Sequence, residues 1–499
     1  MMLTKILLLF VIACPALASE IKLAGIFTDH TVLQRDRVLP VWGWANPNEQ
    51  VTVTFAAQSK SITADANGKW SVKLDPMPAS AEGREFIIQS KIENRQAKIT
   101  DVLVGDVWLC SGQSNMHFQL KSNEKAPEEI AAANNPALRF FTVEHQFLQK
   151  PTDKVSGVWK PISTATAADC SAVAYFFGAA LQPKVGVPIG LVVSSVGGTR
   201  IETWMRSETL AATGEGGALV EKWSHVSPAE FETIGTTYRE FQRQRDEVHP
   251  QAVKEAKAKG MSLPPAPKMP KQRCHDSPSA LHNGMITPLE PFAIRGAIWY
   301  QGESNSAQAR PYEKLLPAMI ADWRQVWGKD MPFLFVQLAP YRDTHPAFRE
   351  AQQCISQSTP HTAMVVTTDV GNANNIHPTR KQPVGERLTL AARALSYGEP
   401  IEYSGPVFKS ISIKGNRAVI SFTHIGEGLM AKDAVLKGFT IAGANGKFVP
   451  AHAVIEGDTV VVTSDKITDP TTVRYGRAQV PEVNLFNREG LPAVPFTSR

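Results

Sequence analysis

Four short apolar runs in the middle of the chain constrain its fold more than any other feature. They are GLVVSS (190–195), GAIWYQ (296–301), FLFVQL (333–338) and AMVVTT (363–368). Each run is nearly continuous in apolar residues, as in strands that are buried on both faces of a parallel sheet. Helical or irregular stretches separate the runs, so helices are expected to flank the sheet. Residues 101–398 therefore predict an α/β domain built on a parallel sheet.

The two flanks of this domain have a different periodicity. In residues 19–100, apolar and polar residues alternate, and the turn residues Asn67 and Gly68 separate two alternating runs, 51–55 and 70–74. This pattern predicts antiparallel hairpins in a small β-sandwich. The same alternation returns in residues 399–499 and predicts a second β-rich module.

Residues 205–271 interrupt the pattern of the central domain. This stretch is polar and charged, carries aromatic residues at intervals and ends in the proline-rich run PPAPKMP. It predicts a helical insertion followed by an extended connector.

The N-terminal residues have the three parts of a secretory signal peptide. Lys5 supplies the positive charge, residues 6–13 form the apolar core, and residues 16–18 form an A-x-A cleavage site. Residues 1–18 are therefore expected to be removed, which leaves an exported chain, periplasmic or secreted. A lipoprotein anchored through Cys14 is the alternative. The apolar core is shorter than the roughly 20 residues of a membrane span, and no later segment reaches that length, so no span is expected.

Composition argues against several other classes of protein. The chain of 499 residues is 43% hydrophobic and 20% charged, as in folded soluble proteins. Its net charge of +5 is not gathered into basic blocks, which argues against nucleic-acid binding. No Cys-x-x-Cys or histidine-rich spacing indicates a metal site.

The cysteines leave two alternatives open. Removal of the signal peptide leaves an even number of them in a compartment where disulfides persist. They could pair in any of three ways, or remain as thiols in a chain large enough to fold without disulfides. They are Cys110, Cys170, Cys274 and Cys354.

Polar, glycine-rich loops follow four apolar segments of the central domain. In open α/β sheets, ligands bind beyond the carboxyl ends of the strands. Such loops are common singly, but four in one domain, each with an aromatic or histidine neighbour, indicate a single site. The segments are DVWLCSGQSN (106–115), LVVSSVGGTR (191–200), AIWYQGESN (297–305) and VVTTDVGNANNIHP (365–378).

Five sequence blocks follow one another along this domain. They are GQSN (112–115), SSVGGTRIETW (194–204), HNGMITPL (282–289), WYQGESN (299–305) and IHPTRKQPVGERL (376–388). In order and approximate spacing they resemble the sialate O-acetylesterase family of SGNH-type hydrolases, over about residues 101–398. The resemblance implies an SGNH-type fold with flanking β-rich modules, and an esterase that needs no metal or organic cofactor.

The resemblance also distinguishes two serines in similar surroundings, Ser114 and Ser304. The family's nucleophile is the serine of the first block, here Ser114, so Ser304 is expected to be structural. The matching base is His377, which would take the proton of Ser114 and return it to the leaving sugar hydroxyl. A helix expected over 381–397 would fix the loop of His377. Because GQSNM lacks the closing glycine of the G-x-S-x-G elbow, the ordinary α/β-hydrolase fold is not indicated.

The group that orients the histidine is left open by the sequence. Many SGNH hydrolases place an aspartate three residues before the histidine, but that position is Asn374 here. Either Asp369 reaches the imidazole from the strand end, or a backbone carbonyl of the 374–375 turn orients it. We favour the carbonyl, because the eight residues after Asp369 would have to fold back.

Several further residues are candidates for binding the oxyanion or the substrate. The oxyanion donors would be the backbone amides of Ser114 and of Gly197 or Gly198, with the side chain of Gln301. Glu303 and Arg200 would position the sugar or each other. The remaining candidates, Gln113 and Asn115, adjoin the nucleophile.

Together these features predict a serine esterase that removes O-acetyl groups from a carbohydrate through an acetyl-Ser114 intermediate. The expected partner is an acetylated sugar or glycan, with O-acetylated sialic acid as the first candidate. A deacetylase of acetylxylan or another hemicellulose is the close alternative, because loops shape the substrate pocket. A non-catalytic carbohydrate-binding protein is the alternative from another class.

Overall fold

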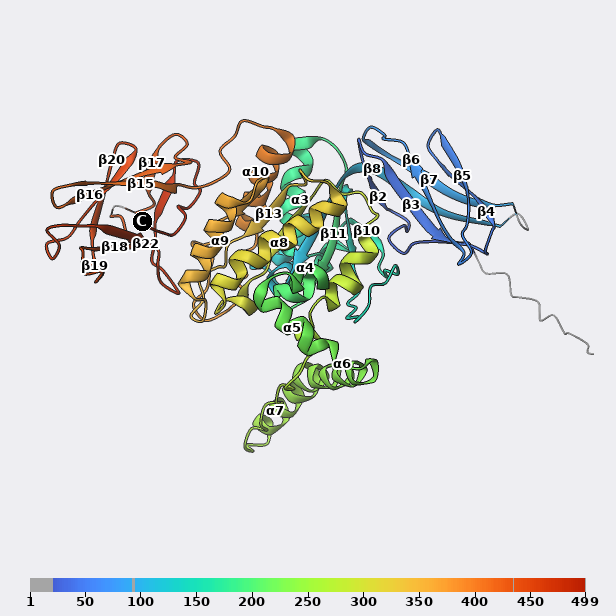
Figure 1. Ribbon diagram of the computed structural model, residues 1–499, viewed down its shortest axis with the longest axis horizontal. Helices are drawn as coiled ribbons and strands as arrows, with labels where there is room; N and C mark the ends of the chain where they lie inside the picture. The colour runs from blue at the N-terminus through green and yellow to red at the C-terminus, as the bar shows by residue number, and fades with distance from the viewer. Residues whose placement is uncertain (1–20, 92–94, 434, 499) are drawn as a thin grey trace, which may run out of the picture.

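The computed structural model of this chain describes residues 21–91, 95–433 and 435–498. The expected signal peptide, residues 1–18, and the alternative anchor Cys14 lie outside the described residues. Figure 1 shows three parts in a row: a β-rich N-terminal module, a central α/β domain and a β-rich C-terminal module. Within the described part of the chain, no helix combines the length and the apolar composition that a membrane crossing requires.

The main path of the central sheet has seven strands, and four of them overlap the apolar runs of the sequence. In spatial order they are β10 (Trp159–Ile162), β9 (Asn135–Thr142), β11 (Ile189–Ser195), β8 (Gln96–Gly112), β12 (Gly296–Tyr300), β13 (Phe333–Val336) and β14 (Thr362–Val365). From β9 to β14 neighbouring strands pair in parallel, whereas β10 pairs antiparallel with β9. The expected α/β class is confirmed. The sheet is mixed rather than wholly parallel, because strands of the N-terminal module also join it through β8.

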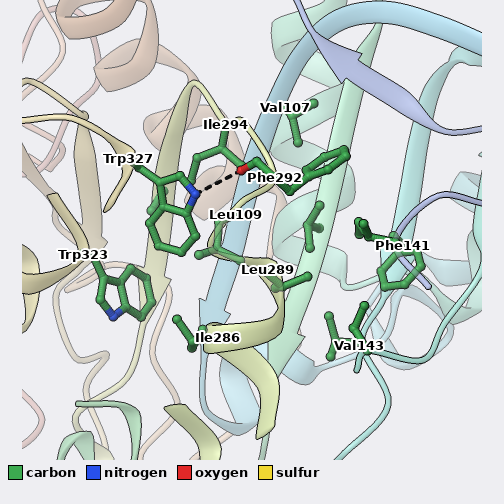
Figure 2. Close-up of a cluster of buried hydrophobic side chains, with 14 of the residues drawn as sticks. Val107, Leu109, Phe141, Val143, Ile286, Leu289, Phe292, Ile294, Trp323 and Trp327 are labelled. Atoms are coloured by element: carbon green, nitrogen blue, oxygen red, sulfur yellow. Dashed lines mark hydrogen bonds between the residues drawn. The ribbon is translucent and has the colours of Figure 1, made fainter. Parts of the chain in front are cut away.

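Helices cover both faces of this sheet. One face carries α3 (Ala172–Val185) and α10 (Gln382–Tyr397), and the other carries α8 (Ala309–Trp327) and α9 (Pro346–Ser358). Successive residues of a strand point to opposite faces, so Trp108 and Leu109 of β8 belong to different hydrophobic cores. Figure 2 shows the core that contains Leu109, where the indole of Trp327 donates a hydrogen bond to the Phe292 carbonyl oxygen at 3.0 Å.

The N-terminal module is a sandwich of two sheets. One sheet contains β1 (Lys22–Leu23), β3 (Leu39–Trp44) and β6 (Lys69–Leu74), and the other contains β4 (Gln50–Phe55), β5 (Gln58–Thr63) and β7 (Ser80–Ser90). The expected hairpin between the runs 51–55 and 70–74 is wrong. β4 pairs with β5 and β7, whereas β6 pairs with β3 in the opposite sheet.

A single strand connects the N-terminal module to the central sheet. β8 is 17 residues long. Its first part pairs antiparallel with β7, its middle pairs parallel with β2 (Val32–Gln34), and its last part lies between β11 and β12. The domain boundary expected between residues 100 and 101 therefore falls inside a strand.

A buried carboxylate reinforces this junction. Asp106 of β8 is fully buried and accepts hydrogen bonds from Arg35 at 3.0 and 3.1 Å and from Arg295 at 2.7 Å. Gln34 and Tyr397 donate to the same carboxylate at 3.1 and 2.9 Å. Burial disfavours the charged form, but the hydrogen bonds and charges of the two arginines outweigh it and hold the pKa of Asp106 below its ordinary value. Asp106 thus connects the N-terminal module, the sheet and the end of α10.

The stretch expected as a helical insertion lies between β11 and β12. It contains α4 (Ser207–Ala211), α5 (Gly214–Ser224), α6 (Pro228–Arg243) and α7 (His249–Ala258), and residues 261–270 follow without regular secondary structure. Figure 1 shows α6 and α7 projecting away from the body of the protein.

The C-terminal module has a hydrophobic core of its own. Its sheets contain β15 (Val407–Lys414), β16 (Arg417–Thr423), β20 (His452–Glu456) and β21 (Thr459–Thr463); β18 (Phe439–Ala442), β19 (Val449–Pro450), β22 (Thr472–Tyr475) and β24 (Phe496–Thr497); and β17 (Leu429–Ala431) with β23 (Leu485–Asn487). Two-residue turns join β15 to β16 and β20 to β21, at the Gly-Asn and Gly-Asp pairs of the sequence.

The four cysteines of the described residues form no disulfide. Cys110, Cys170 and Cys274 are buried, and Cys354 is exposed on α9. Of the two alternatives left by the sequence, thiols without disulfides match this arrangement.

Candidate active site

The turn that carries the expected nucleophile forms where β8 ends. Gly112, the last residue of β8, has a φ of +138°, and a Cβ there would lie 2.2 Å from the Tyr300 carbonyl oxygen. Glycine is therefore the residue that fits this position. α1 (Ser114–His117) begins two residues later with Ser114. The turn places Ser114 at the carboxyl edge of the sheet, between β11 and β12.

Ser114 and His377 form a hydrogen-bonded dyad. Nε2 of His377 lies 2.8 Å from Oγ of Ser114. Burial, assisted by the charge of Lys381, holds the pKa of His377 below its ordinary value of 6.5. A neutral imidazole at this distance can accept the hydroxyl proton of the serine.

The loop between β14 and α10 fixes the position of His377. The backbone amide of His377 donates to Oδ1 of Asn375 at 2.9 Å, and Nδ2 of Asn115 donates to the Ile376 carbonyl oxygen at 3.0 Å. Asn115 directly follows the nucleophile, so its carboxamide connects the nucleophile turn to the loop that carries His377. α10 begins at Gln382, one residue from the start expected for this helix.

Asp369 is bound to an arginine instead of the histidine. Both of its carboxylate oxygens accept hydrogen bonds from Arg387 at 2.7 Å. Within the described residues, Nδ1 of His377 makes no hydrogen bond, either to Asp369 or to a carbonyl of the 374–375 turn. The geometry is therefore that of a dyad, and neither of the two expected orienting groups is in place.

This arrangement predicts that Asp369→Asn affects stability more than catalysis. The substitution leaves the charge of Arg387, which is about nine-tenths buried, without its counter-ion, at an expected cost of about 3 kcal/mol in unfolding free energy. Turnover of an acetate ester should stay within about threefold of the wild type, because an orienting carboxylate is worth about 10⁴-fold only where it holds the imidazole. Urea unfolding and initial rates measure the two effects. A hundredfold loss of turnover in folded protein would assign Asp369 to the histidine.

Two glycines after β11 lie against the nucleophile. A Cβ on Gly197 would lie 3.3 Å from the Cβ of Ser114. The amide of Val196 donates to the Gly112 carbonyl oxygen at 3.1 Å, whereas the amides of Gly197 and Gly198 make no hydrogen bond within the residues that the structure describes. With the amide of Ser114, they remain the candidate donors for an oxyanion.

Gln301 is not placed as an oxyanion donor, contrary to expectation. Its fully buried carboxamide donates through Nε2 to the Thr199 carbonyl oxygen at 3.1 Å and to Oδ1 of Asn305 at 2.8 Å. Its Oε1 accepts a hydrogen bond from the Tyr312 hydroxyl at 2.9 Å. Both N–H groups are therefore used inside the protein, and Gln301 holds two loops of the site together.

Gln113 has a similar structural role. Its Oε1 lies 3.2 Å from the amide nitrogen of Gly302 and 3.3 Å from that of Ser304, and both amides donate to it. This contact fixes the WYQGESN block against the nucleophile turn. The hydroxyl of Ser304 makes no hydrogen bond within the described residues, in contrast to the Ser114 hydroxyl, which is paired with a histidine.

The sequence did not reveal a buried lysine behind the dyad. Lys381 is fully buried, its ammonium group is bonded to Oδ1 of Asn115, and it lies 5.0 and 5.3 Å from the ring centroids of Phe118 and Tyr300. Burial lowers the pKa of Lys381 to about 7, against the opposing charge of Glu303. Because lysine side chains are mostly exposed, nothing in the sequence indicated a buried one here. Its position in the fifth sequence block was the one indication that Lys381 lies near the site.

Glu303 completes this buried network. It accepts a hydrogen bond from Nδ2 of Asn115, and its Oε2 is buried without a hydrogen-bond partner in the described part of the chain. Burial raises the pKa of Glu303, and this effect is larger than the opposite effect of its hydrogen bonds and of the charge of Lys381. Glu303 and Arg200 were expected to position the sugar or each other, but no hydrogen bond or ion pair between described residues joins them.

Two histidines beside the nucleophile were also missed. The ring centroids of His117, the last residue of α1, and His145 are 5.2 Å apart, and Nε2 of His145 lies 3.1 Å from the Ser195 carbonyl oxygen. Burial, with His145 acting in the same direction, lowers the pKa of His117 to about 4. Burial also lowers the pKa of His145 below its ordinary value of 6.5, so the neutral form of both rings predominates at neutral pH. The two residues are far apart in the sequence, and only the fold brings them together.

A family model and curated relatives that cover most of the chain indicate the same family. The sequence model of the family described as carbohydrate esterase, sialic acid-specific acetylesterase, matches residues 104–234 and 278–394. The sialate O-acetylesterase of Mus musculus is 31% identical over 446 residues, which cover 81% of this chain and 79% of the mouse protein. That of Rattus norvegicus is 30% identical over 531 residues, covering 96% and 94% of the two chains.

One solved structure extends this similarity to the flanking modules. The crystal structure of a carbohydrate acetylesterase from Xanthomonas citri matches with a TM-score of 0.81 and 36% sequence identity. The match covers 96% of this chain and 99% of that one, so both β-rich flanks are included.

Proposed function

Since this chain belongs to the family of sialic acid-specific carbohydrate acetylesterases, we propose that it is a serine esterase that hydrolyses O-acetyl groups of a carbohydrate at Ser114. One observation carries the proposal: the 2.8 Å contact between Ser114 Oγ and His377 Nε2. The contact pairs a hydroxyl at the carboxyl edge of the sheet with a base of lowered pKa. The positions of the sequence blocks at the strand ends support an SGNH-type arrangement of the central domain.

In the first half of the reaction, Oγ of Ser114 attacks the acetyl carbonyl carbon while Nε2 of His377 takes the hydroxyl proton. The amides of Ser114, Gly197 and Gly198 would donate hydrogen bonds to the resulting oxyanion. Collapse of this intermediate breaks the bond to the sugar oxygen, which receives the proton from His377. The acetyl group is then bound to Ser114 as an ester.

In the second half, water attacks the acetyl-Ser114 carbonyl carbon and His377 takes its proton. The second tetrahedral intermediate collapses to acetate, and the proton returns to Ser114. The side chains of Asn115, Gln113 and Gln301 keep the loops of the site in place during both steps. The chemistry uses groups of the chain and water only.

O-acetylated sialic acid is the first candidate substrate. Arg200 is half-buried and lies three residues after Gly197. Its backbone carbonyl accepts a hydrogen bond from the Thr203 amide at 3.3 Å, but its side chain makes no hydrogen bond or ion pair with any described residue. Its guanidinium is therefore available to a carboxylate, which sialic acid has and a chain of acetylated xylose units does not. Acetylxylan or another hemicellulose remains the second candidate. Residues 1–18 support export to the periplasm or the medium.

A substrate panel tests this proposal. Mass spectrometry should detect loss of acetate from O-acetylated sialic acids, with acetylated xylooligosaccharides as the competing class. A chromogenic acetate ester serves as a substrate that is hydrolysed without binding of a sugar. A folded enzyme that releases acetate from none of these would be a carbohydrate-binding protein instead.

The buried lysine makes a prediction about the pH profile. Because the pKa of Lys381 is about 7 and that of His377 lies below 6.5, Lys381 is protonated where His377 titrates. Its charge disfavours the imidazolium and lowers the pKa of His377. kcat/KM for an acetate ester should therefore rise with pH through a midpoint below 6.5, and Lys381→Met should move that midpoint to higher pH.

Two variants complete this experiment. Lys125→Met removes the same charge at an exposed position and should leave the midpoint where it is. His377→Ala should abolish the pH-dependent limb. A Lys381→Met enzyme with an unshifted midpoint would show that Lys381 does not act on His377 electrostatically.

A further inference from the structure

A large cavity lies between the central domain and the C-terminal module. Its volume is about 1020 Å³, at the upper end of the range for small-molecule sites, about 300 to 1,000 Å³. On the side of the central domain, the wall is formed by the start of α8, one face of α9 and the first turns of α5. Phe408 of β15 and residues 494–497 form the wall on the other. Neither Ser114 nor His377 lines this cavity.

The near end of the cavity is built on the same loops as the nucleophile. Arg200 lines it and lies three residues after Gly197, so their Cα atoms are no more than about 11 Å apart. Asn305 of the WYQGESN block accepts a hydrogen bond from the Ile201 amide at 3.0 Å. The same side chain donates to Glu202 at 3.0 Å and to Gln308 at 3.3 Å, two further lining residues. The near end of the cavity is therefore formed by the same two loops, 196–202 and 301–308, that lie beside the nucleophile turn.

Polar contacts hold the far wall in place. Arg349 of α9 is fully buried and donates to the carbonyl oxygens of Ala478 and Gln479 in the C-terminal module, at 2.8 and 2.7 Å. Its neighbour Glu350 pairs with Arg477 and accepts a hydrogen bond from Thr497 at 2.7 Å. The two walls are thus joined at the rim, which makes the cavity a preformed feature rather than a gap across a flexible linker.

The lining has the chemistry of a sugar-binding site. Phe408 is half-buried and stacks on the buried ring of Phe496, with ring centroids 4.9 Å apart and planes at 19°, so Phe408 offers an apolar contact for the C–H face of a sugar ring. Basic and acidic side chains line the cavity in equal number, so no net charge selects a polyanion. Gln308 and Gln353 add neutral donors and acceptors suited to hydroxyl groups.

We propose that this cavity binds the sugar units that neighbour the acetylated residue, so that the enzyme acts on acetyl groups carried by an oligosaccharide chain rather than by a free monosaccharide. The inference rests on the proposed esterase function, and it assigns the C-terminal module as one wall of the substrate site. An oligosaccharide that contains sialic acid and one from hemicellulose share this chemistry, and the two arms of the experiment distinguish them.

The first experiment fills the cavity. Gln353→Trp on α9 places an indole among the lining residues, and Gln325→Trp makes the same change at an exposed position of α8 outside the cavity. For each enzyme, kcat/KM is measured on acetylated xylotetraose, on an O-acetylated sialyl-trisaccharide and on 4-nitrophenyl acetate. The ratio of oligosaccharide to nitrophenyl ester activity should fall about tenfold or more in Gln353→Trp, the loss of about 1.4 kcal/mol of binding, and should keep its wild-type value in Gln325→Trp.

A second experiment measures binding without catalysis. The thiol of Cys354 is exposed and lines the cavity, so its reaction with a maleimide reports occupancy in the native chain. Deacetylated xylotetraose or sialyllactose should slow this reaction more than xylose or free sialic acid does. Equal labelling rates, or an unchanged activity ratio in Gln353→Trp, would overturn the inference. Failure of the esterase proposal would be seen separately, as a wild-type enzyme that does not hydrolyse 4-nitrophenyl acetate.

Discussion

Ser114→Ala is expected to reduce kcat/KM for an acetate ester by about 10⁴-fold or more, the range found when a serine nucleophile is removed. The reason is that Oγ forms the bond to the acetyl group, and within the described residues no other hydroxyl is paired with His377. Folding should not change, because this hydroxyl is bonded only to His377. Initial rates measure the loss, and circular dichroism with thermal unfolding confirms that the variant is folded.

Ser304→Ala is the matched control for this prediction. Ser304 occupies a similar Gly-x-Ser-Asn sequence, but the structure uses its amide, bound to Gln113 at 3.3 Å, and not its hydroxyl. The variant should keep turnover within about threefold, because no described contact of the side chain is lost. A fluorophosphonate probe should label Ser114 alone. Labelling of Ser304, or activity in Ser114→Ala, would place the nucleophile elsewhere.

Asp106→Asn should give the largest loss of stability. The substitution keeps the shape of the side chain but leaves Arg35 and Arg295 without their buried counter-ion, at a cost of about 3 to 5 kcal/mol. Urea unfolding of the two enzymes under the same conditions measures this difference. Asp75→Asn is the control, because the Asp75 side chain is 69% exposed and, among the described residues, its carboxylate pairs only with Lys60, a contact worth less than about 1 kcal/mol.

The difference in unfolding free energy between the wild type and Asp106→Asn should depend on pH, because the pKa of Asp106 is lowered in the folded protein. A carboxylate with a depressed pKa stabilises the fold above its unfolded pKa, about 3.9, and this contribution is lost as the pH falls through the lower folded value. The gap in unfolding free energy between wild type and Asp106→Asn should therefore narrow below about pH 4. A gap that is absent at neutral pH would show that the ion cluster contributes nothing to stability.

The main features of the fold could be read from periodicity, because burial on both faces of a strand leaves an unbroken apolar run. β12 and β13 lie within runs recognised in the sequence, and β11 and β14 each begin one residue before theirs. Strand pairing in the N-terminal module could not be read in the same way. Alternation identifies β4 and β6 as strands, but it does not say which strand each will pair with, and β5 is too polar to be recognised by its apolar residues.

The site shows a similar division. Motif resemblance identified Ser114 and His377, which the fold brings within hydrogen-bonding distance. The oxyanion role expected of Gln301 did not match its contacts. Neither the favoured carbonyl of the 374–375 turn nor the alternative, Asp369, contacts His377. A sequence does not show which hydrogen-bond acceptor a carboxamide will contact, or which cation a carboxylate will pair with. Lys381 was missed because its burial depends on the packing of α10 against the nucleophile turn.

The strand β8 has a consequence for how the protein is made. Its pairing with β7 is local and can form as soon as residue 112 is synthesised, whereas its partners β11 and β12 begin 77 and 184 residues later. Local contacts form faster than distant ones, so the N-terminal module should complete first and present the apolar end of β8 as a template for the catalytic sheet. Until those partners arrive, that end is an unpaired edge, which exposes the nascent chain to aggregation. We therefore expect a fragment that stops near residue 112 to be insoluble on its own and to become soluble when the rest of the chain is supplied.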